Sequence, residues 1–519
     1  MSVSQPVLVA IKSNWQSIAE RPIVGKDVLE LLSSSMYVNP LAIYREYVQN
    51  AADSIEEAVA LGLLSPREMG KVEIKIDPDG RIVRIRDNGT GVSKSVFAGT
   101  LVALGASRKR GTKARGFRGV GRLAGLGYCQ ELIFRSKADG EREVSEMRWD
   151  CKRLKSILRD SSFRGDVEEL IKEVVRVHRS AADDVRSHFF EVELSGIVRH
   201  GDDRLVNMEA IRDYLCQVAP VPFSPSFRFA KQIGEMLRDG VSMGNVHIYL
   251  NGEDQPLFRP HRETFEARKG VTDCFVDVRF FEIKGNDGEL AAKGWVLDHG
   301  YFGAIDTSAS IKGLRLRSGN MQVGDSDVLD QLFTESRFNA WAVGEFHVLD
   351  ERILPNGRRD HFEQNTHFNS LLGQLRPIAQ DLSRRCRQSS IRRNIVRQFV
   401  ILTEQVGHNL SVMSQGAISQ TDRKRVERDT IRVLDRIEKL ASHSILDPDE
   451  GKKMLRALHR FRRRIGDIDH ANQHKVLTGM NTREKVVVTR VCSLIYELSG
   501  NKSAAKQLID RLLSKLGRS

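Results

Sequence analysis

Residues 71–91 read KVEIKIDPDGRIVRIRDNGTG, and this stretch decides the fold. Apolar and charged residues alternate in KVEIKID (71–77), and the following DPDG (77–80) is typical of a turn. A second alternating run then leads into DNGTG (87–91). The stretch therefore predicts a β-hairpin whose second strand ends at an aspartate.

That aspartate is placed unusually for a charged residue. Because side chains alternate along a strand, Val83, Ile85 and Asp87 share one face. A carboxylate on an apolar face is costly to bury unless something donates hydrogen bonds to it, and a ligand with an amine edge would do so. Gly89 and Gly91 follow, and a backbone without Cβ atoms can turn sharply and approach a flat ligand closely. Asp-Asn-Gly is also ordinary turn material, so this motif alone leaves both interpretations open.

Upstream, PLAIYREYVQNAADSIEEAVALG (40–62) has the composition and apolar periodicity of a helix. At about 100° per residue, Glu46, Asn50 and Asp53 fall within about 60° of arc on one face. The adjoining apolar sector, which we expect to pack on the sheet, consists of Tyr47, Val48, Ala51 and Ile55. Two acids and an amide at the edge of a buried face suit a metal-phosphate site, with a carboxylate to take a proton from water and an amide oxygen to bind Mg²⁺. A charged, solvated helix surface is the alternative.

Downstream, LGASRKRGTKARGFRGVGRLAGLG (104–127) contains seven glycines. A glycine-rich loop that opens a helix offers unpaired backbone N–H groups and the positive end of the helix dipole to phosphates. Linkers are also rich in glycine, so GFRGVG (116–121) is not specific by itself.

The three motifs occur in order between positions 46 and 122, and together they are specific. Through EYVQNAAD (46–53), DNGTG (87–91) and GFRGVGR (116–122) the sequence resembles the GHKL superfamily of ATPases, which comprises gyrase, heat-shock chaperone, histidine kinase and MutL. It looks most like the heat-shock-chaperone-like branch. The resemblance covers about residues 20–200 well and extends more loosely to about 365. It implies an α+β protein that begins with a Bergerat-type α/β sandwich, in which ATP lies between helices and a mixed, antiparallel-rich sheet.

The resemblance also implies roles for individual residues. Asp87 would accept from the adenine amino group, Asn50 would be the metal ligand that holds Mg²⁺, and Glu46 would deprotonate the attacking water. Gly119 and Gly121 would donate backbone N–H groups to the terminal phosphates, in a lid over about 105–122. The full nucleotide-binding set that the resemblance implies is Asn50, Asp53, Asp87, Gly89, Gly91, Ser107, Gly116, Gly119, Val120 and Gly121.

One departure concerns the adenine end of the site. Members of the family usually have a threonine on a late strand, reaching the water bound to adenine, but HFFEVELSGI (188–197) contains none. Ser187 or a water molecule would have to replace it.

Residues 201–370 resemble the α/β transducer domain that follows the ATPase domain in these relatives, where it supplies a basic residue to the γ-phosphate. Lys312 is our candidate for this catalytic role, with Arg315 and Arg317 as rivals. PNGRRD (355–360) is typical of a turn and predicts exposed arginines.

The third predicted domain, residues 371–519, is basic and helical. It holds 30 Lys+Arg and 15 Asp+Glu, a net charge of +15, whereas residues 1–370 hold the remaining 51 and 53, a net charge of −2. Apolar residues recur at helical spacings between basic runs such as HRFRRRIGD (459–467). A basic helical face can bind phosphate backbones, acidic partners or anionic lipid, and a solvated helix surface is an equal alternative.

Composition excludes several classes. The 519 residues are 40% hydrophobic and 29% charged, which is enough apolar material for a core in each of several domains and argues against a disordered or fibrous chain. No apolar run approaches the roughly 20 residues that span a bilayer. We therefore expect a cytoplasmic protein without a membrane partner, with domains 1–200, 201–370 and 371–519.

The function that we expect is a slow, Mg²⁺-dependent ATPase, a homodimeric and nucleotide-gated clamp that acts like a chaperone on a protein client or operon partner. The alternative is an ATP-dependent DNA-binding clamp, MutL-like or defence-related, that uses the basic C-terminal helices. A nucleotide-sensing scaffold with negligible hydrolysis is a third possibility. A histidine kinase is disfavoured because His178 is the first histidine, so no phosphoacceptor helix precedes the motifs. A topoisomerase is disfavoured because about 150 residues after the transducer leave no room for a cleavage core.

Overall fold

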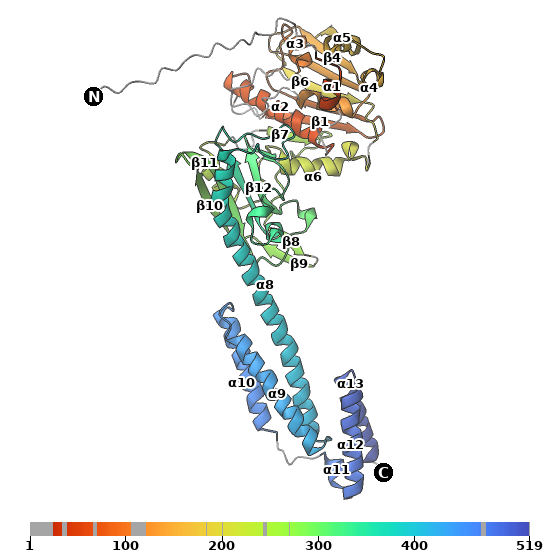
Figure 1. Ribbon diagram of the computed structural model, residues 1–519, viewed down its shortest axis with the longest axis vertical. Coiled ribbons are helices and arrows are strands. Elements are labelled where there is room, and N and C mark those ends of the chain that lie inside the picture. Colours follow the sequence, from red (N-terminus) through yellow and green to blue (C-terminus); the bar gives the residue numbers. More distant parts are fainter. Residues whose placement is uncertain are drawn as a thin grey trace, which may run out of the picture. The chain divides into compact units, whose positions relative to one another are not determined.

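The computed structural model describes residues 24–33, 39–65, 70–104, 121–182, 184–199, 201–241, 246–268, 270–468 and 474–517. The chain divides into two compact units. The first unit comprises Met1–His299 and Ala304–Ala379, and the second comprises Gly300–Gly303 and Gln380–Ser519. The first unit holds all the strands of the described ranges and the second is helical, so the predicted α+β class is confirmed (Figure 1).

A seven-stranded sheet organises the N-terminal part of the first unit, in the order β5-β4-β3-β6-β2-β1-β7. All neighbouring strands are antiparallel except β1 and β7, which are parallel, so the sheet is mixed and antiparallel-rich as expected. The strands are β1 (Gly70–Asp77), β2 (Ile82–Asp87), β3 (Glu131–Lys137), β4 (Glu143–Asp150), β5 (Val175–Ala181), β6 (Phe189–Ser195) and β7 (Val246–Leu250). Because β7 joins this sheet, the sheet extends past residue 200, the predicted end of the first domain.

The predicted hairpin is confirmed as β1 and β2. Ile74 lies opposite Ile85 and Val72 lies opposite Asp87. All four side chains are buried, which places the Asp87 carboxylate on the apolar face of the sheet, as the alternation predicted.

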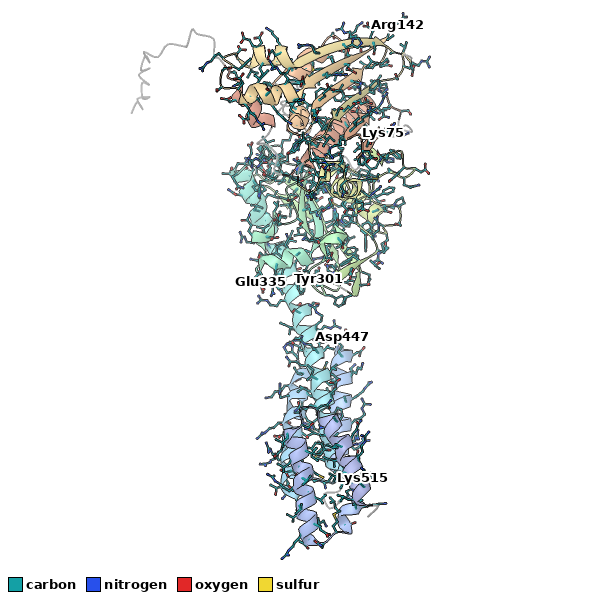
Figure 2. All side chains as sticks on the ribbon, turned by 90° about the vertical axis from the view of Figure 1, so that its right-hand side faces the viewer. Lys75, Arg142, Tyr301, Glu335, Asp447 and Lys515 are labelled. Atoms are coloured by element: carbon teal, nitrogen blue, oxygen red, sulfur yellow. The ribbon has the colours of Figure 1, made fainter. Side chains whose placement is uncertain are left out.

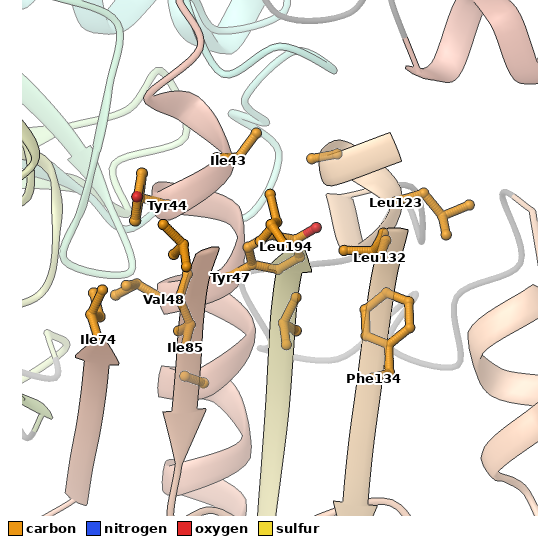
Figure 3. Packing of buried hydrophobic residues seen from close by; sticks show 14 of the residues in the cluster. Ile43, Tyr44, Tyr47, Val48, Ile74, Ile85, Leu123, Leu132, Phe134 and Leu194 are labelled. Carbon is orange, nitrogen blue, oxygen red and sulfur yellow. The ribbon is translucent and has the colours of Figure 1, made fainter. Parts of the chain in front are cut away.

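Helix α2 (Ala42–Ala60) covers that face. Figure 3 shows Tyr44, Tyr47 and Val48 of α2 packed over strands that carry Ile85 and Leu194. The predicted apolar sector of α2 is at most 3% exposed at each position, which confirms it. Each such large side chain contributes about 1.5–3 kcal/mol by burial, so α2 is fixed firmly on the sheet.

Shorter helices complete this part of the first unit. They are α1 (Asp27–Ser33), α3 (Phe97–Val102), η1 (Gly121–Gly127), α4 (Cys151–Arg159), α5 (Val167–Val174), η2 (Arg204–Val206) and α6 (Met208–Val218), whereas α7 (Ala230–Leu237) packs on the sheet described next. Of these, η1 matters most for the site because it follows the glycine-rich segment directly.

The rest of the first unit is built on a five-stranded sheet in the order β10-β11-β14-β12-β13, with a separate β8-β9 pair. The strands are β8 (Thr264–Arg268), β9 (Val271–Cys274), β10 (Asp277–Lys284), β11 (Leu290–Asp298), β12 (Gly313–Ser318), β13 (Met321–Val323) and β14 (Val343–Val348), with 3-10 turns η3 (Thr307–Ala309), η4 (Asp330–Leu332) and η5 (Ser336–Trp341). Its core contains an ion-paired cluster in which Glu345 contacts Arg259 and Arg317, all at most 1% exposed.

The second unit is helical, which confirms the prediction for the C-terminal region. Helix α8 (Thr366–Gln415) belongs to this unit from Gln380 onward. It is followed by α9 (Gln420–Ala441), α10 (Pro448–Gly466), α11 (Lys475–Thr478), α12 (Thr482–Leu498) and α13 (Lys502–Leu516). Helix α10 begins with a capping box, in which Asp447 and Glu450 satisfy backbone N–H groups reciprocally, and Pro448 occupies the first turn. Among the helices of the described ranges, none is long and apolar enough to cross a membrane.

Candidate functional site

Glu46 lies on α2, and its carboxylate is held by two arginines. Its Oε1 lies 3.3 Å from Nη2 of Arg45 and 3.8 Å from Nε of Arg359. Arg45 also donates to the backbone oxygen of Arg358 at 2.8 Å. The side chains of Glu46, Arg45 and Arg359 are each only 8–9% exposed. This cluster therefore ties α2 to the turn at 355–360 through charges that water screens weakly.

The end of the glycine-rich segment faces the same carboxylate. A Cβ atom added to Gly121, the first residue of η1, would lie 2.4 Å from Oε2 of Glu46. Tyr47 fixes η1 in this position, because its hydroxyl donates to the Arg122 backbone oxygen at 3.2 Å and accepts from the Gly125 N–H at 3.0 Å. Only a glycine at position 121 lets η1 approach Glu46 this closely.

The DNGTG segment docks on the same helix farther along. The backbone N–H of Thr90 donates to the Ser54 backbone oxygen at 3.3 Å, and the hydroxyls of the same two residues are 3.2 Å apart. Ser54 follows Glu46 by eight residues, which is about 12 Å along a helix. Gly121, the described end of the glycine-rich motif, and the DNGTG segment therefore meet α2 about two turns apart.

Asp87 is 5% exposed, and its Oδ1 accepts a hydrogen bond of 2.8 Å from the Gly89 N–H. Asp53, one residue before Ser54, is 7% exposed. Two buried acids therefore lie beside the contact between α2 and the DNGTG segment.

Close packing within the protein also requires both glycines of DNGTG. A Cβ on Gly89 would lie 2.3 Å from the Ser54 hydroxyl, and one on Gly91 would lie 2.1 Å from the Lys137 backbone oxygen. Gly91 has a φ of +65°, a conformation that favours glycine. These contacts explain the two glycines by close packing within the protein, and their contact with a ligand stays a prediction.

The donors present fit a magnesium ion that is shared with phosphates. Asn50 is half-buried, and within the described part of the chain its amide forms no hydrogen bond. Among the described residues, no group of three or more His, Cys, Asp and Glu side chains forms a metal cage. Mg²⁺ usually takes one or two protein oxygens and completes its shell with phosphate oxygens and waters, so one amide is a suitable contribution. On the same face, Gln49 is 1% exposed and its buried Oε1 has no partner within the described ranges.

Comparison with known proteins agrees with this geometry. Residues 42–165 match the sequence profile of the family described as histidine kinase-, DNA gyrase B-, and HSP90-like ATPase. Residues 42–165 are therefore similar to the ATPase domain of the GHKL superfamily. The matched segment contains α2, the hairpin and η1, which are the elements that meet at the candidate site.

The curated proteins that this chain resembles include chaperones. The endoplasmin homolog of Hordeum vulgare is 25% identical over 187 residues, which is 29% of this chain and 23% of that protein. The chaperone protein HtpG of Salinispora tropica is 31% identical over 115 residues, which is 21% of this chain and 17% of that protein. The similarity to these chaperones is partial, because the chain covers less than a quarter of the length of either relative.

The ATPase region of Saccharomyces cerevisiae topoisomerase II aligns with a TM-score of 0.38 and 12% identity, over 66% of this chain and 84% of that one. A likeness this low carries no argument about function.

Four of the expected GHKL site residues lie outside the described ranges: Ser107, Gly116, Gly119 and Val120. Their roles stay predictions, and Gly121 is the described end of this motif.

The expected transducer residues lie in and before β12. Lys312 precedes the strand, is partly exposed and keeps its predicted role as a proposal. Its two rivals are buried and hydrogen-bonded within the middle of the first unit. Arg315 donates to the backbone oxygen of Ser310 at 2.8 Å, and Arg317 donates to that of Asn320 at 2.9 Å.

The prediction of exposed arginines in the turn at 355–360 is confirmed for one arginine and wrong for the other. Arg358 is exposed, but Arg359 is 7% exposed and faces Glu46. Arg359 has a φ of +56°, which redirects the chain at this turn. A turn motif signals only that the chain reverses, so nothing local could reveal that its second arginine meets an acid from the beginning of the chain.

Two further residues at the aspartate end were missed. The Nδ1 atom of His188 lies 2.6 Å from the Gly89 backbone oxygen, and Phe190 is paired with Asp87 across the sheet. The hydroxyl of Ser187, the expected substitute for the missing threonine, donates to the Asp184 backbone oxygen at 3.0 Å. A histidine and an aromatic residue therefore neighbour the DNGTG motif.

Proposed function

We propose that this protein is a Mg²⁺-dependent ATPase that binds ATP along α2, with adenine at Asp87 and the terminal phosphates at η1. One observation supports this most: Gly121 and the DNGTG segment meet the same buried helix about two turns apart, at Glu46 and at Ser54. A nucleoside triphosphate has the same polarity, with a hydrogen-bonding base at one end and a polyanion at the other.

At the base end, Asp87 accepts from the exocyclic amine, and this contact offsets the cost of burying the carboxylate. Phe190 lies beside Asp87 in the sheet, so an aromatic side chain neighbours the acid that we assign to adenine. Adenine selectivity then depends on Asp87 and on shape.

At the phosphate end, the backbone N–H of Gly121 is oriented by η1, and Asn50 offers an amide oxygen to the metal. When bound, Mg²⁺ would neutralise charge on the phosphate oxygens. Asp53 supports Asn50 from the next turn of α2.

Glu46 orients and deprotonates the attacking water. Its Oε1 lies within ion-pair distance of two guanidinium groups, which fix the carboxylate at the position of the phosphate end. We propose that Arg359, in addition to Lys312, supplies positive charge to the γ-phosphate, because Arg359 already lies within ion-pair distance of Glu46.

We also propose that the protein works as a homodimer, a nucleotide-gated clamp on a protein partner, and that turnover is slow because it waits on closure of the segment at 105–122. The chaperone names of the relatives support a protein client.

The test is Glu46→Ala, compared with Glu57→Ala, which removes an exposed acid from the same helix. We expect Glu46→Ala to bind ATP with nearly unchanged affinity by calorimetry and to lose hydrolysis by at least about 10²-fold. Glu57→Ala should behave like the unmodified protein. Surviving turnover in Glu46→Ala would remove Glu46 as the base, and absence of ATP binding in the unmodified protein would remove the proposal itself.

A further inference from the structure

Helix α10 carries a run of charge of one sign. Positions 451–466 contain seven Lys+Arg and one His, and no Asp or Glu. The acids that flank the run, Asp449, Glu450 and Asp467, lie at the ends of the helix (Asp447, at its start, is marked in Figure 2). Charge therefore accumulates along the middle of α10.

Five of these cations form one outer face, which we call the α10 ridge: Lys453, Arg456, Arg460, Arg463 and Arg464. At about 100° per residue they span about 100° of arc. The opposite side of α10 is buried, with Met454 and Leu458 in the helical core. The ridge therefore points away from the core of the second unit.

The ridge cations have no internal partners within the described ranges, although nearby acids do. Glu438 is paired with Arg462, Glu450 with Arg392 and Asp449 with Lys452. Every ridge side chain is exposed, and none forms an ion pair or side-chain hydrogen bond with a described residue. Five adjacent cations left without carboxylates repel one another, and binding of a polyanion relieves that repulsion.

The kind of polyanion follows from what the ridge lacks. None of the exposed large hydrophobic side chains lies on α10, so the ridge has no apolar residues to insert into lipid. Its one Phe, Phe461, is partly buried against the helical core, and helix α10 has no Tyr or Trp to present for stacking of unpaired bases. Four of the five cations are arginines, whose planar guanidinium matches phosphate oxygens in pairs. These features favour a regular phosphate backbone over a lipid surface or a single strand.

We propose that the α10 ridge binds the phosphodiester backbone of duplex nucleic acid without reading its sequence. Helix α10 has 19 residues, about 28 Å at 1.5 Å per residue, which is long enough for the cations to meet several successive phosphates. Helix α9 adds a second row of exposed cations: Arg425, Arg428, Arg432, Arg436 and Lys439. The proposal does not rest on the ATPase site, since it concerns only the second unit.

The experiment measures binding of the full-length protein to a fluorescent DNA duplex of arbitrary sequence by anisotropy, without nucleotide, between roughly 50 and 200 mM salt. The variant is Arg456→Gln, Arg460→Gln and Arg463→Gln together. The control removes three exposed cations of the first unit, by Lys75→Gln, Arg142→Gln and Arg179→Gln (Lys75 and Arg142 are marked in Figure 2).

Each phosphate contact contributes about 0.9 to the slope of log K against log salt, so the ridge variant should lower that slope by about 2.7. The control variant has the same net charge and should keep the slope of the unmodified protein. A second variant, Arg460→Gln with Arg464→Gln, should lower the slope by about 1.8 and guards against misfolding of the first. An RNA duplex tested in parallel shows which backbone is preferred, and binding of either supports the proposal.

Three results would overturn the proposal. The first is an equal loss of slope in the ridge and control variants, because that would reflect net charge alone. The second is absence of duplex binding at low salt. The third is binding only to vesicles of anionic lipid or to polyglutamate, which would assign the ridge to a membrane or to an acidic protein.

Discussion

Replacement of Gly121 by alanine tests the phosphate end of the site with one methyl group. The added Cβ would lie 2.4 Å from Oε2 of Glu46, whereas ordinary contact begins at 3.4 Å, so the carboxylate must move by the difference of about 1 Å. It cannot turn into solvent easily, because its side chain is 9% exposed and held by Arg45 and Arg359. A displacement of about 1 Å in a catalytic group costs about 10²-fold in rate, or about 2.7 kcal/mol in barrier.

Alanine keeps the backbone N–H at position 121, so we expect kcat to fall about 10²-fold while the Kd for ATP changes little. Steady-state phosphate release and calorimetry with ATP measure the two quantities separately. Gly99→Ala in α3 is the matched control, because nothing lies within 4 Å of its added Cβ, and it should keep full activity. Turnover in Gly121→Ala within twofold of the unmodified protein would refute the assignment of Glu46 and η1 to one reaction centre.

Two further predictions concern the arginine beside Glu46 and the buried histidines. Arg359→Gln should lower kcat by about 10²-fold with little change in the Kd for ATP, because a charge that stabilises the transition state is lost. A smaller loss of kcat in Arg359→Gln than in Lys312→Gln would assign this role to Lys312 instead. Burial lowers the pKa of His261 to about 3 and that of His347 to about 4, so between these values and about 6.5 the unfolded chain binds more protons than the folded one. The free energy of unfolding of the first unit should therefore be highest above about pH 6.5 and fall by up to about 2.7 kcal/mol per pH unit toward pH 4. Denaturant titrations at several pH values measure this profile. A flat profile would contradict the burial of both rings.

The sequence predicted the local parts of the fold well. Alternation in residues 71–87 and helical periodicity in residues 40–62 are short-range patterns, and both elements form where expected. The inward orientation of Asp87 followed from the period of two along a strand and is confirmed by its burial.

The sequence did not predict contacts between segments that are distant along the chain. Strand β7 pairs with β1, although the rest of the seven-stranded sheet separates the two strands along the chain, and no local pattern specifies such a neighbour. Arg45 and Arg359 are charged residues, which the sequence alone would place on the surface. Both are buried because they pair with Glu46. The pairing of Asp87 with Phe190 depends on strand order, which the sequence alone left undetermined.

The most direct test of the proposed site is a structure of the protein with Mg²⁺ and a non-hydrolysable ATP analogue. The proposed site predicts the adenine amine within hydrogen-bond distance of the Asp87 carboxylate, the metal on the Asn50 amide oxygen, and the γ-phosphate beside Glu46 and Gly121. A nucleotide bound away from α2, or bound there in the reverse orientation, would contradict it.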